Sequence, residues 1–251
     1  MEVLETATKP IALIGNGGVS KTRLAIEHAW RQVSRRNAVL LISAGSAEAL
    51  NRNLAALCQP DGLDLPQQSE REETVQRDAV LHWFQANPGW LLIFDGVDAA
   101  EAAVAIKGLL PRFTGGQVVI TTRLRNWSAA MQSIEVDVLP PEEATAFLLE
   151  RTAERRRQAD EEATTAAAIA VKDLGGLALA LEQAGACISQ RRLSLAAYRR
   201  QWQSSREQVL HWSDAQLMQY DQSLATTWLT SYRAVSDGAS TLLRRLAWLS
   251  P

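Results

Sequence analysis

A glycine-rich turn between a buried strand and a helix is the feature that most constrains how this chain can fold. Residues 11–14 are apolar, Gly15 opens a turn rich in glycine, and Lys21 and Thr22 begin the next helical stretch. Glycine lets successive backbone N–H groups curl around phosphate oxygens, and the N-terminus of the following helix adds positive potential. The pattern predicts a phosphate-binding loop in which Lys21 reaches the β- and γ-phosphates and the Thr22 hydroxyl ligates Mg²⁺.

Ser20 stands where this loop pattern has a glycine, directly before the lysine. If Ser20 adopts helical dihedral angles, its side chain only tightens the phosphate pocket, whereas a positive φ would strain the loop by about 1–3 kcal/mol. A glycine-rich turn with an exposed lysine is the simpler alternative to phosphate binding. A dinucleotide-binding loop fits poorly, because the third glycine is missing and the second strand ends in Ser43 rather than near an acid.

A buried strand that ends in a carboxylate is the second sign of phosphate chemistry. Residues 90–94 are apolar and Asp95 follows them. An acid at the end of a strand next to the loop strand can hold the Mg²⁺ water shell, although an isolated aspartate there more often caps the next helix. Gly96 takes the place of the acid that polarises water in ATPases. Asp98 either substitutes for that acid or caps a helix over residues 99–106, and we favour the cap.

A third strand, at residues 118–121, leads into Thr121, Thr122 and Arg123. An arginine at this position can form a forked contact with a γ-phosphate. A lone arginine at a strand end usually lies at the surface, so the prediction depends on the loop and the aspartate strand occurring in the same chain.

Alternating apolar runs and amphipathic stretches in the first half predict a parallel sheet with helices on both faces. A capping box of Ser69 and Glu72 is expected to begin one of these helices. The expected strands are residues 11–14, 39–42, 90–94, 118–121 and 134–138, and the expected helices include residues 21–33 and 72–84.

Beyond residue 139 the sequence shows only helical periodicity. Pro140, Pro141 and the acids behind them favour a helix start, because a missing N–H and negative charge suit the first turn. We expect an α/β domain over residues 1–139, a helical domain over 140–212, and the start of a further unit over 213–251. The helical stretches are residues 144–151, 161–174, 177–189, 195–202 and 224–249.

The composition is globular and disfavours several partners. The chain has 251 residues, of which 47% are hydrophobic and 22% charged, with a net charge of −2. This charge offers no basic field for nucleic acid, and no apolar run approaches the ~18 residues of a membrane span. Two cysteines cannot build a disulfide framework or a zinc site, and His28, His82 and His211 lack suitably spaced partners. Together with the acidic start, these features predict a soluble, cytoplasmic protein.

The motifs in this order, followed by Leu-Gly-Gly-Leu-Ala-Leu-Ala at residues 174–180, resemble an NB-ARC domain. This domain is the nucleotide switch of the STAND class of signalling NTPases, and the chain is most similar to bacterial and fungal forms with tetratricopeptide repeats downstream. Residues 226–228 and 231–232 add to the resemblance. It implies a P-loop NTPase three-layer α/β domain with a parallel sheet, then an all-α helical domain and the start of a winged-helix domain. We therefore expect a fragment of a larger receptor.

The resemblance implies a module that binds ADP or ATP with Mg²⁺, in which nucleotide exchange controls self-oligomerisation and hydrolysis is slow. The expected partners are the nucleotide, an upstream effector, and downstream winged-helix and repeat domains. Two alternatives stay open. One is a scaffold whose nucleotide site has degenerated, and the other is the regulatory ATPase domain of a transcription regulator.

The resemblance also implies which residues form the site. Asp95 and Arg123 are the expected catalytic residues, and Thr22 and Asp95 are the expected Mg²⁺ ligands. Ala178 replaces the family's proline that packs on adenine, which together with Ser20 and Gly96 indicates an altered or weakened site. The expected nucleotide-binding residues are Gly15, Asn16, Gly17, Gly18, Val19, Ser20, Lys21, Thr22, Arg23, Leu177 and Ala178.

Overall fold

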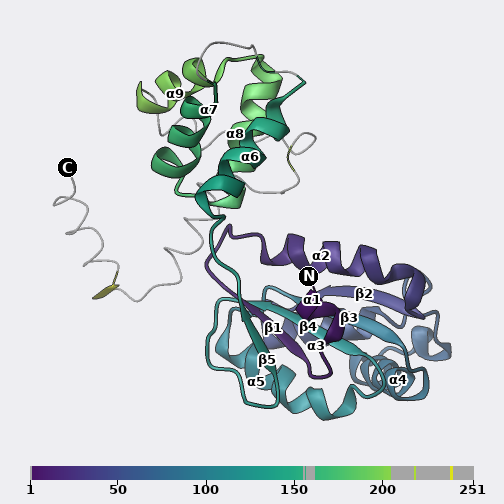
Figure 1. Ribbon diagram of the computed structural model, residues 1–251. Helices are drawn as coiled ribbons and strands as arrows, with labels where there is room; N and C mark the ends of the chain where they lie inside the picture. Colours follow the sequence, from purple (N-terminus) through teal and green to yellow (C-terminus); the bar gives the residue numbers. More distant parts are fainter. Residues whose placement is uncertain (1, 155, 157–161, 205–217, 219–237, 240–251) are drawn as a thin grey trace. The chain divides into compact units, whose positions relative to one another are not determined.

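The computed structural model of the chain describes residues 2–154, 156, 162–204, 218 and 238–239. These residues form two compact units (Figure 1). The first unit holds the chain up to Asn16 together with Ser20–Val136, and the second holds Gly17–Val19 together with the described residues from Asp137 onward.

The first unit is built on a five-stranded sheet in the order β2-β3-β4-β1-β5, in which all neighbouring strands are parallel. This confirms the predicted α/β class. Parallel strands end at one edge of a sheet, so the segments that follow β1, β3 and β4 lie at the same edge. The strands are β1 (Ile11–Ile14), β2 (Ala38–Ser43), β3 (Trp90–Asp95), β4 (Gln117–Thr122) and β5 (Gln132–Glu135).

Helices cover both faces of this sheet. Alternate strand residues point to opposite faces, so Ile93 belongs to the core under α1 and α2, whereas Leu92 belongs to the core under α3, α4 and α5. The helices are α1 (Glu2–Thr6), α2 (Lys21–Gln32), α3 (Ala47–Ala56), α4 (Glu73–Ala86) and α5 (Ala100–Leu109), with 3₁₀ turns at Val33–Arg35, Pro66–Ser69 and Leu110–Arg112.

The second unit contains helices around a core of its own. An ion pair joins two of them, since the Arg151 guanidinium contacts the Glu182 carboxylate at 2.9 Å and Glu182 is buried. Gly175 and Gly176 precede α8 with φ of 61° and 68°, a left-handed conformation that suits glycine. The elements are α6 (Pro141–Thr152), α7 (Glu162–Ala167), a π-helical segment (Ala168–Asp173), α8 (Ala178–Arg191) and α9 (Leu195–Ser204).

Several local expectations differ from the structure. The last strand is Gln132–Glu135 rather than residues 134–138, because its register follows the four residues of β1. The capping box is wrong: Ser69 ends a 3₁₀ turn, and Glu72 is the N-cap of α4. Of the helix expected over 161–174, the described part is helical over residues 162–173, and its second half is the π-helical segment.

The expectations for the end of the chain lie outside the described residues. These are the helix over residues 224–249 and the winged-helix start over 213–251, apart from residues 218 and 238–239.

Candidate functional site

The turn after β1 has the left-handed backbone that its glycines allow, and Ser20 shares it. Gly18 has a φ of 83°. Ser20, the N-cap of α2, has φ 74° and ψ 27°, and its hydroxyl makes no capping hydrogen bond to α2 among the described residues. Of the two alternatives for Ser20, the structure therefore shows the strained one, since a side chain in this region costs free energy that glycine does not.

Lys21, the first residue of α2, points back over the turn. Its Nζ donates hydrogen bonds to the carbonyl oxygens of Gly15 and Asn16, both at 2.8 Å. Burial lowers the pKa of the Lys21 ammonium from its ordinary value, and the carboxylates of Asp98 and Asp95 oppose that shift. The ammonium is thus held at the turn, where a phosphate group would be a stronger partner than two neutral carbonyls.

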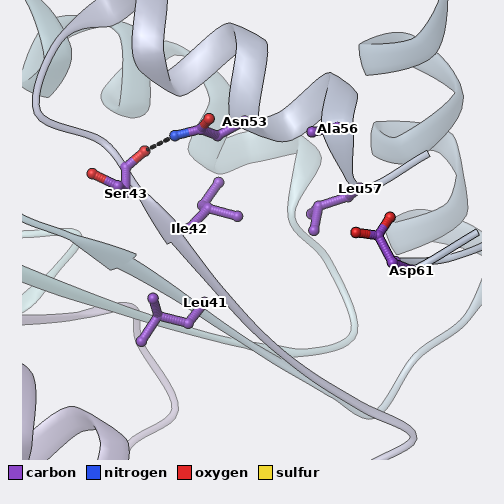
Figure 2. Close-up of a pocket in the computed structure, with 8 residues that line it drawn as sticks. Leu41, Ile42, Ser43, Asn53, Ala56, Leu57 and Asp61 are labelled. Carbon is purple, nitrogen blue, oxygen red and sulfur yellow. Dashed lines mark hydrogen bonds between the residues drawn. The ribbon is translucent and has the colours of Figure 1, made fainter. Parts of the chain in front are cut away.

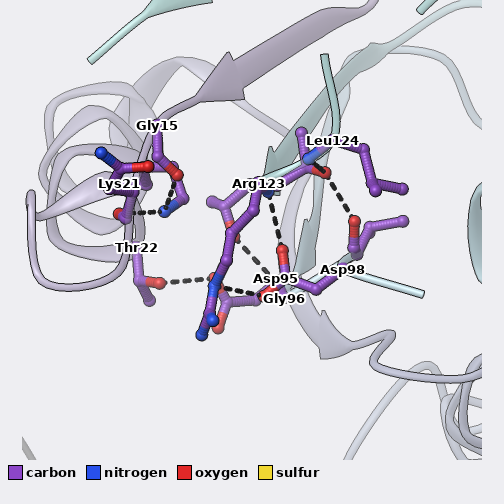
Figure 3. A network of polar contacts seen from close by, with 12 residues as sticks. Gly15, Lys21, Thr22, Asp95, Gly96, Asp98, Arg123 and Leu124 are labelled. Atoms are coloured by element: carbon purple, nitrogen blue, oxygen red, sulfur yellow. Dashed lines mark hydrogen bonds and ion pairs between the residues drawn. The ribbon is translucent and has the colours of Figure 1, made fainter. Parts of the chain in front are cut away.

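The Asp95 carboxylate, at the end of β3, accepts hydrogen bonds from two hydroxyl groups (Figure 3). Its Oδ1 accepts hydrogen bonds from Thr22 Oγ1 at 2.7 Å and from Thr121 Oγ1 at 2.6 Å. The expectation that the strand of Asp95 lies next to the strand of the loop was wrong, because β4 lies between them. The pairing with Thr22 nevertheless brings together two hard oxygen ligands of the kind that Mg²⁺ prefers.

The ends of β3 and β4 are tied together by hydrogen bonds. Gly96 N–H donates to Thr121 Oγ1 at 2.9 Å, and Val97 N–H donates to the Thr121 carbonyl at 2.9 Å. In return, Thr122 Oγ1 donates to the Val97 carbonyl at 2.6 Å. Both threonines thus have a structural role that the sequence analysis did not predict. The two adjacent threonines at the end of the strand were the signal that could have indicated it.

Asp98 does not cap the following helix as expected. Helix α5 begins at Ala100 with Ala99 as its N-cap. The Asp98 carboxylate instead accepts the backbone N–H of Arg123 at 2.7 Å and pairs with Arg123 Nε at 3.0 Å. The preference for a helix cap was wrong because the end of β4 offers a charged partner that local sequence cannot reveal.

The remaining expected site residues lie at two places. Val19 is buried, and Arg23 is exposed on the first turn of α2. Leu177 and Ala178 lie at the start of α8 in the second unit, to which the tip of the turn also belongs. Within that unit, Leu179 N–H donates to the Gly18 carbonyl at 3.0 Å.

A cavity of about 260 Å³ lies elsewhere in the first unit, between β2 and α3 (Figure 2). Asn53 Nδ2 donates to the Ser43 carbonyl at its rim, at 2.7 Å. Asp61 is the charged residue of its lining, and none of the expected site residues contributes to it. The residues able to handle phosphate therefore lie around the turn after β1 rather than in this cavity.

In the part of the chain that the structure describes, no helix is both long and apolar enough to cross a bilayer.

The parallel sheet, the glycine-rich turn after β1 and these contacts resemble the arrangement of P-loop proteins. No family model matches the sequence. Among curated proteins, a nucleotide-binding leucine-rich repeat (NLR)-like protein of the fungus Hyaloscypha variabilis is 25% identical over 259 residues, which span 92% of this chain and 26% of that protein. This similarity agrees with the resemblance to STAND/NB-ARC proteins that the motifs predicted, and the chain covers about a quarter of this relative's length.

Among solved structures, two partial matches are noted. A STAND protein with a tetratricopeptide repeat sensor from Pyrococcus horikoshii is 17% identical with a TM-score of 0.49, and the match covers 94% of this chain and 32% of that one. The Drosophila origin recognition complex bound to DNA includes a chain that is 14% identical with a TM-score of 0.45, covering 91% of this chain and 63% of that one. Both scores are below 0.5.

Proposed function

We propose that this chain is the ADP- and ATP-binding switch module of a cytoplasmic STAND-class signalling protein. The observation that carries the proposal is the contact between Thr22 and Asp95, which joins the helix after the glycine-rich turn to the end of β3. Lys21 lies on the same turn. A cation, a pair of hard oxygen ligands and a helix N-terminus beside a glycine-rich turn are what a nucleoside polyphosphate with Mg²⁺ requires.

The chain's own residues would divide the work of binding. The backbone of residues 15–20 would hold the phosphates, and Lys21 would exchange its two carbonyl partners for phosphate oxygens. Thr22 and Asp95 would hold Mg²⁺, which neutralises phosphate charge when bound. Arg123 would contact the γ-phosphate, and Leu177 with Ala178 would face the base.

Hydrolysis by this module should be slow. Gly96 supplies no carboxylate next to Asp95, and its N–H is hydrogen bonded to Thr121. Asp98 is engaged by Arg123 rather than placed as a base. Phosphoryl transfer needs an oriented water as well as charge stabilisation, and without one hydrolysis is slow. We propose that this slow hydrolysis resets the switch. Exchange of ADP for ATP then controls self-oligomerisation. The wider protein's effector, winged-helix and repeat domains would be the module's partners.

A degenerate scaffold is the second candidate, and the backbone of Ser20 favours it. A serine at φ 74° strains the phosphate loop by about 1–3 kcal/mol where the loop pattern has a glycine, which would carry no such strain. In this alternative the fold serves oligomerisation and the nucleotide is lost.

Calorimetry of the purified chain with ADP and with ATP, each with and without Mg²⁺, tests the proposal. We expect binding that depends on Mg²⁺, and a nucleotide at 100 times its Kd should stabilise the fold by about 2.7 kcal/mol. Lys21→Ala should abolish both effects. Lys107→Ala is the matched control, because Lys107 donates to the Asn126 carbonyl outside the site. A melting temperature that millimolar nucleotide leaves unchanged would support the scaffold instead.

A further inference from the structure

Two cations and two carboxylates meet at the carboxyl edge of the sheet. Lys21 and Arg123 carry the positive charges, and Asp95 and Asp98 carry the negative ones (Figure 3). Both carboxylates and the guanidinium act through space on the Lys21 ammonium. Their formal charges cancel, so the negative charge of an entering phosphate is balanced only by Mg²⁺ and by any cation that leaves its carboxylate partner.

Asp98 holds both the backbone and the side chain of a single residue. One carboxylate oxygen accepts the Arg123 N–H at 2.7 Å, and the other pairs with Arg123 Nε at 3.0 Å. The side chains of Asp98 and Arg123 are 34% and 32% exposed, so the pair is partly shielded from solvent. Such a pair is stronger than one between fully exposed side chains.

The backbone beside this carboxylate is held by hydrogen bonds to the end of β4. Val97 precedes Asp98, and Thr121 and Thr122 precede Arg123. The Val97 N–H donates to the Thr121 carbonyl, and the Val97 carbonyl accepts from the Thr122 hydroxyl. Asp98 and Arg123 therefore lie on two segments that are hydrogen bonded to each other, which fixes the backbone on both sides of the ion pair.

We propose that Asp98 is an internal counter-ion for Arg123 that sets the preference of the site between nucleoside di- and triphosphates. Arg123 would exchange Asp98 for the terminal phosphate, so that binding a triphosphate costs the ion pair and binding a diphosphate does not. This inference rests on the proposed function and names the residue that selects the nucleotide state. It assigns Asp98 a role in specificity rather than in proton transfer.

The Asp98→Asn variant tests the proposal, because an amide oxygen can still accept the Arg123 N–H while the negative charge is gone. Calorimetry with Mg²⁺ should show that the variant favours ATP over ADP more than the unmodified chain does. The Kd for ADP divided by the Kd for ATP should rise about tenfold, on the scale of one partly shielded charge interaction. Asp78→Asn is the matched control, since it removes a carboxylate that pairs with Arg77 and Arg112 outside the site. It should leave the ratio unchanged.

Replacement of the arginine completes the experiment. In an Arg123→Gln background, Asp98→Asn should no longer shift the ratio, because the pair it disrupts is already absent. If Asp98→Asn instead weakens ATP binding as Arg123→Gln does, Asp98 orients the arginine toward phosphate and the proposal is wrong. An equal change for ADP and ATP would also overturn it, as it would show a general electrostatic effect.

A measurement without nucleotide separates this inference from the proposed function. In a ¹⁵N spectrum of the nucleotide-free chain, the Arg123 Nε–H should exchange slowly with solvent, and Asp98→Asn should make it exchange fast. Rapid exchange in the unmodified chain would disprove the ion pair and the inference with it. Slow exchange in a chain that binds neither nucleotide would instead refute the proposed function, and the assigned nucleotide selection with it.

Discussion

Replacing Ser20 with glycine should stabilise this protein, although it removes a side chain from the N-terminus of a helix. Ser20 has a φ of 74°, where the Cβ of a residue other than glycine meets the backbone carbonyl. This conformation costs about 1–2 kcal/mol. Glycine also gains freedom in the unfolded chain, which reduces the benefit by about 0.4–1 kcal/mol. The Ser20 hydroxyl makes no capping bond to α2 in the described structure, so its removal takes no helix cap away.

The net gain should be about 0.5–1 kcal/mol in the free energy of unfolding. At this chain length about 1 kcal/mol corresponds to roughly 2–4 °C in melting temperature, which thermal unfolding followed by tryptophan fluorescence resolves. The same substitution should tighten ADP and ATP binding, since a relaxed turn without Cβ lets the backbone approach the phosphates more closely.

Two further variants separate backbone strain from the chemistry of the side chain. Ser20→Ala keeps the Cβ at φ 74° and removes only the hydroxyl, so it should bring no gain. Gly18→Ala adds a Cβ at φ 83° and should lose about 1–2 kcal/mol. Backbone strain at Ser20 is ruled out if Ser20→Ala stabilises the protein as much as Ser20→Gly, or if Ser20→Gly destabilises the fold.

Three other predictions, two of them with a control variant, test the site and the two units. Gly96→Asp should raise ATP turnover from a rate well below ~1 s⁻¹. It should also lower the free energy of unfolding by about 1 kcal/mol, because Gly96 has a φ of 73°, although the space around its Cβ position is open. Gly96→Asn carries the same strain without the charge and should leave phosphate release unchanged; an equal rise in both variants would rule out water orientation. Burial lowers the pKa of His28, so as the pH falls the imidazole is protonated in the unfolded state before it is protonated in the folded state. The free energy of unfolding should therefore decrease as the pH drops below about 6.5. His28→Gln should flatten that dependence in urea unfolding between pH 7.5 and 5.5, and an unchanged slope would place the titration elsewhere. Gly176→Ala should destabilise the second unit by about 1–3 kcal/mol, because its Cβ would lie 2.5 Å from the Leu139 carbonyl oxygen at a φ of 68°. Gly175→Ala, at φ 61° in open space, should cost less in the same denaturation assay.

The sequence alone determined the elements that follow from local pattern. Continuous apolar runs predicted β1, β3 and β4 close to their observed bounds, since a strand buried on both faces needs no polar alternation. Helix α6 begins at Pro141, as predicted from its prolines and acids. Helix α3 was not predicted, although Ser46 accepts a hydrogen bond from Ala49 N–H at 3.1 Å as a helix cap does. Its short amphipathic stretch is too weak a pattern without knowledge of the sheet that it covers.

The chemistry of the candidate site divides in the same way. Glycine, lysine, threonine and aspartate could be identified from the sequence, because phosphate and Mg²⁺ demand those residue types beside a strand–turn–helix. The sequence could not show the φ of Ser20, which depends on how the turn enters α2. Nor could it show that Asp98 pairs with Arg123. Those two residues are far apart in the chain, and only the parallel pairing of β3 with β4 brings the ends of their strands together.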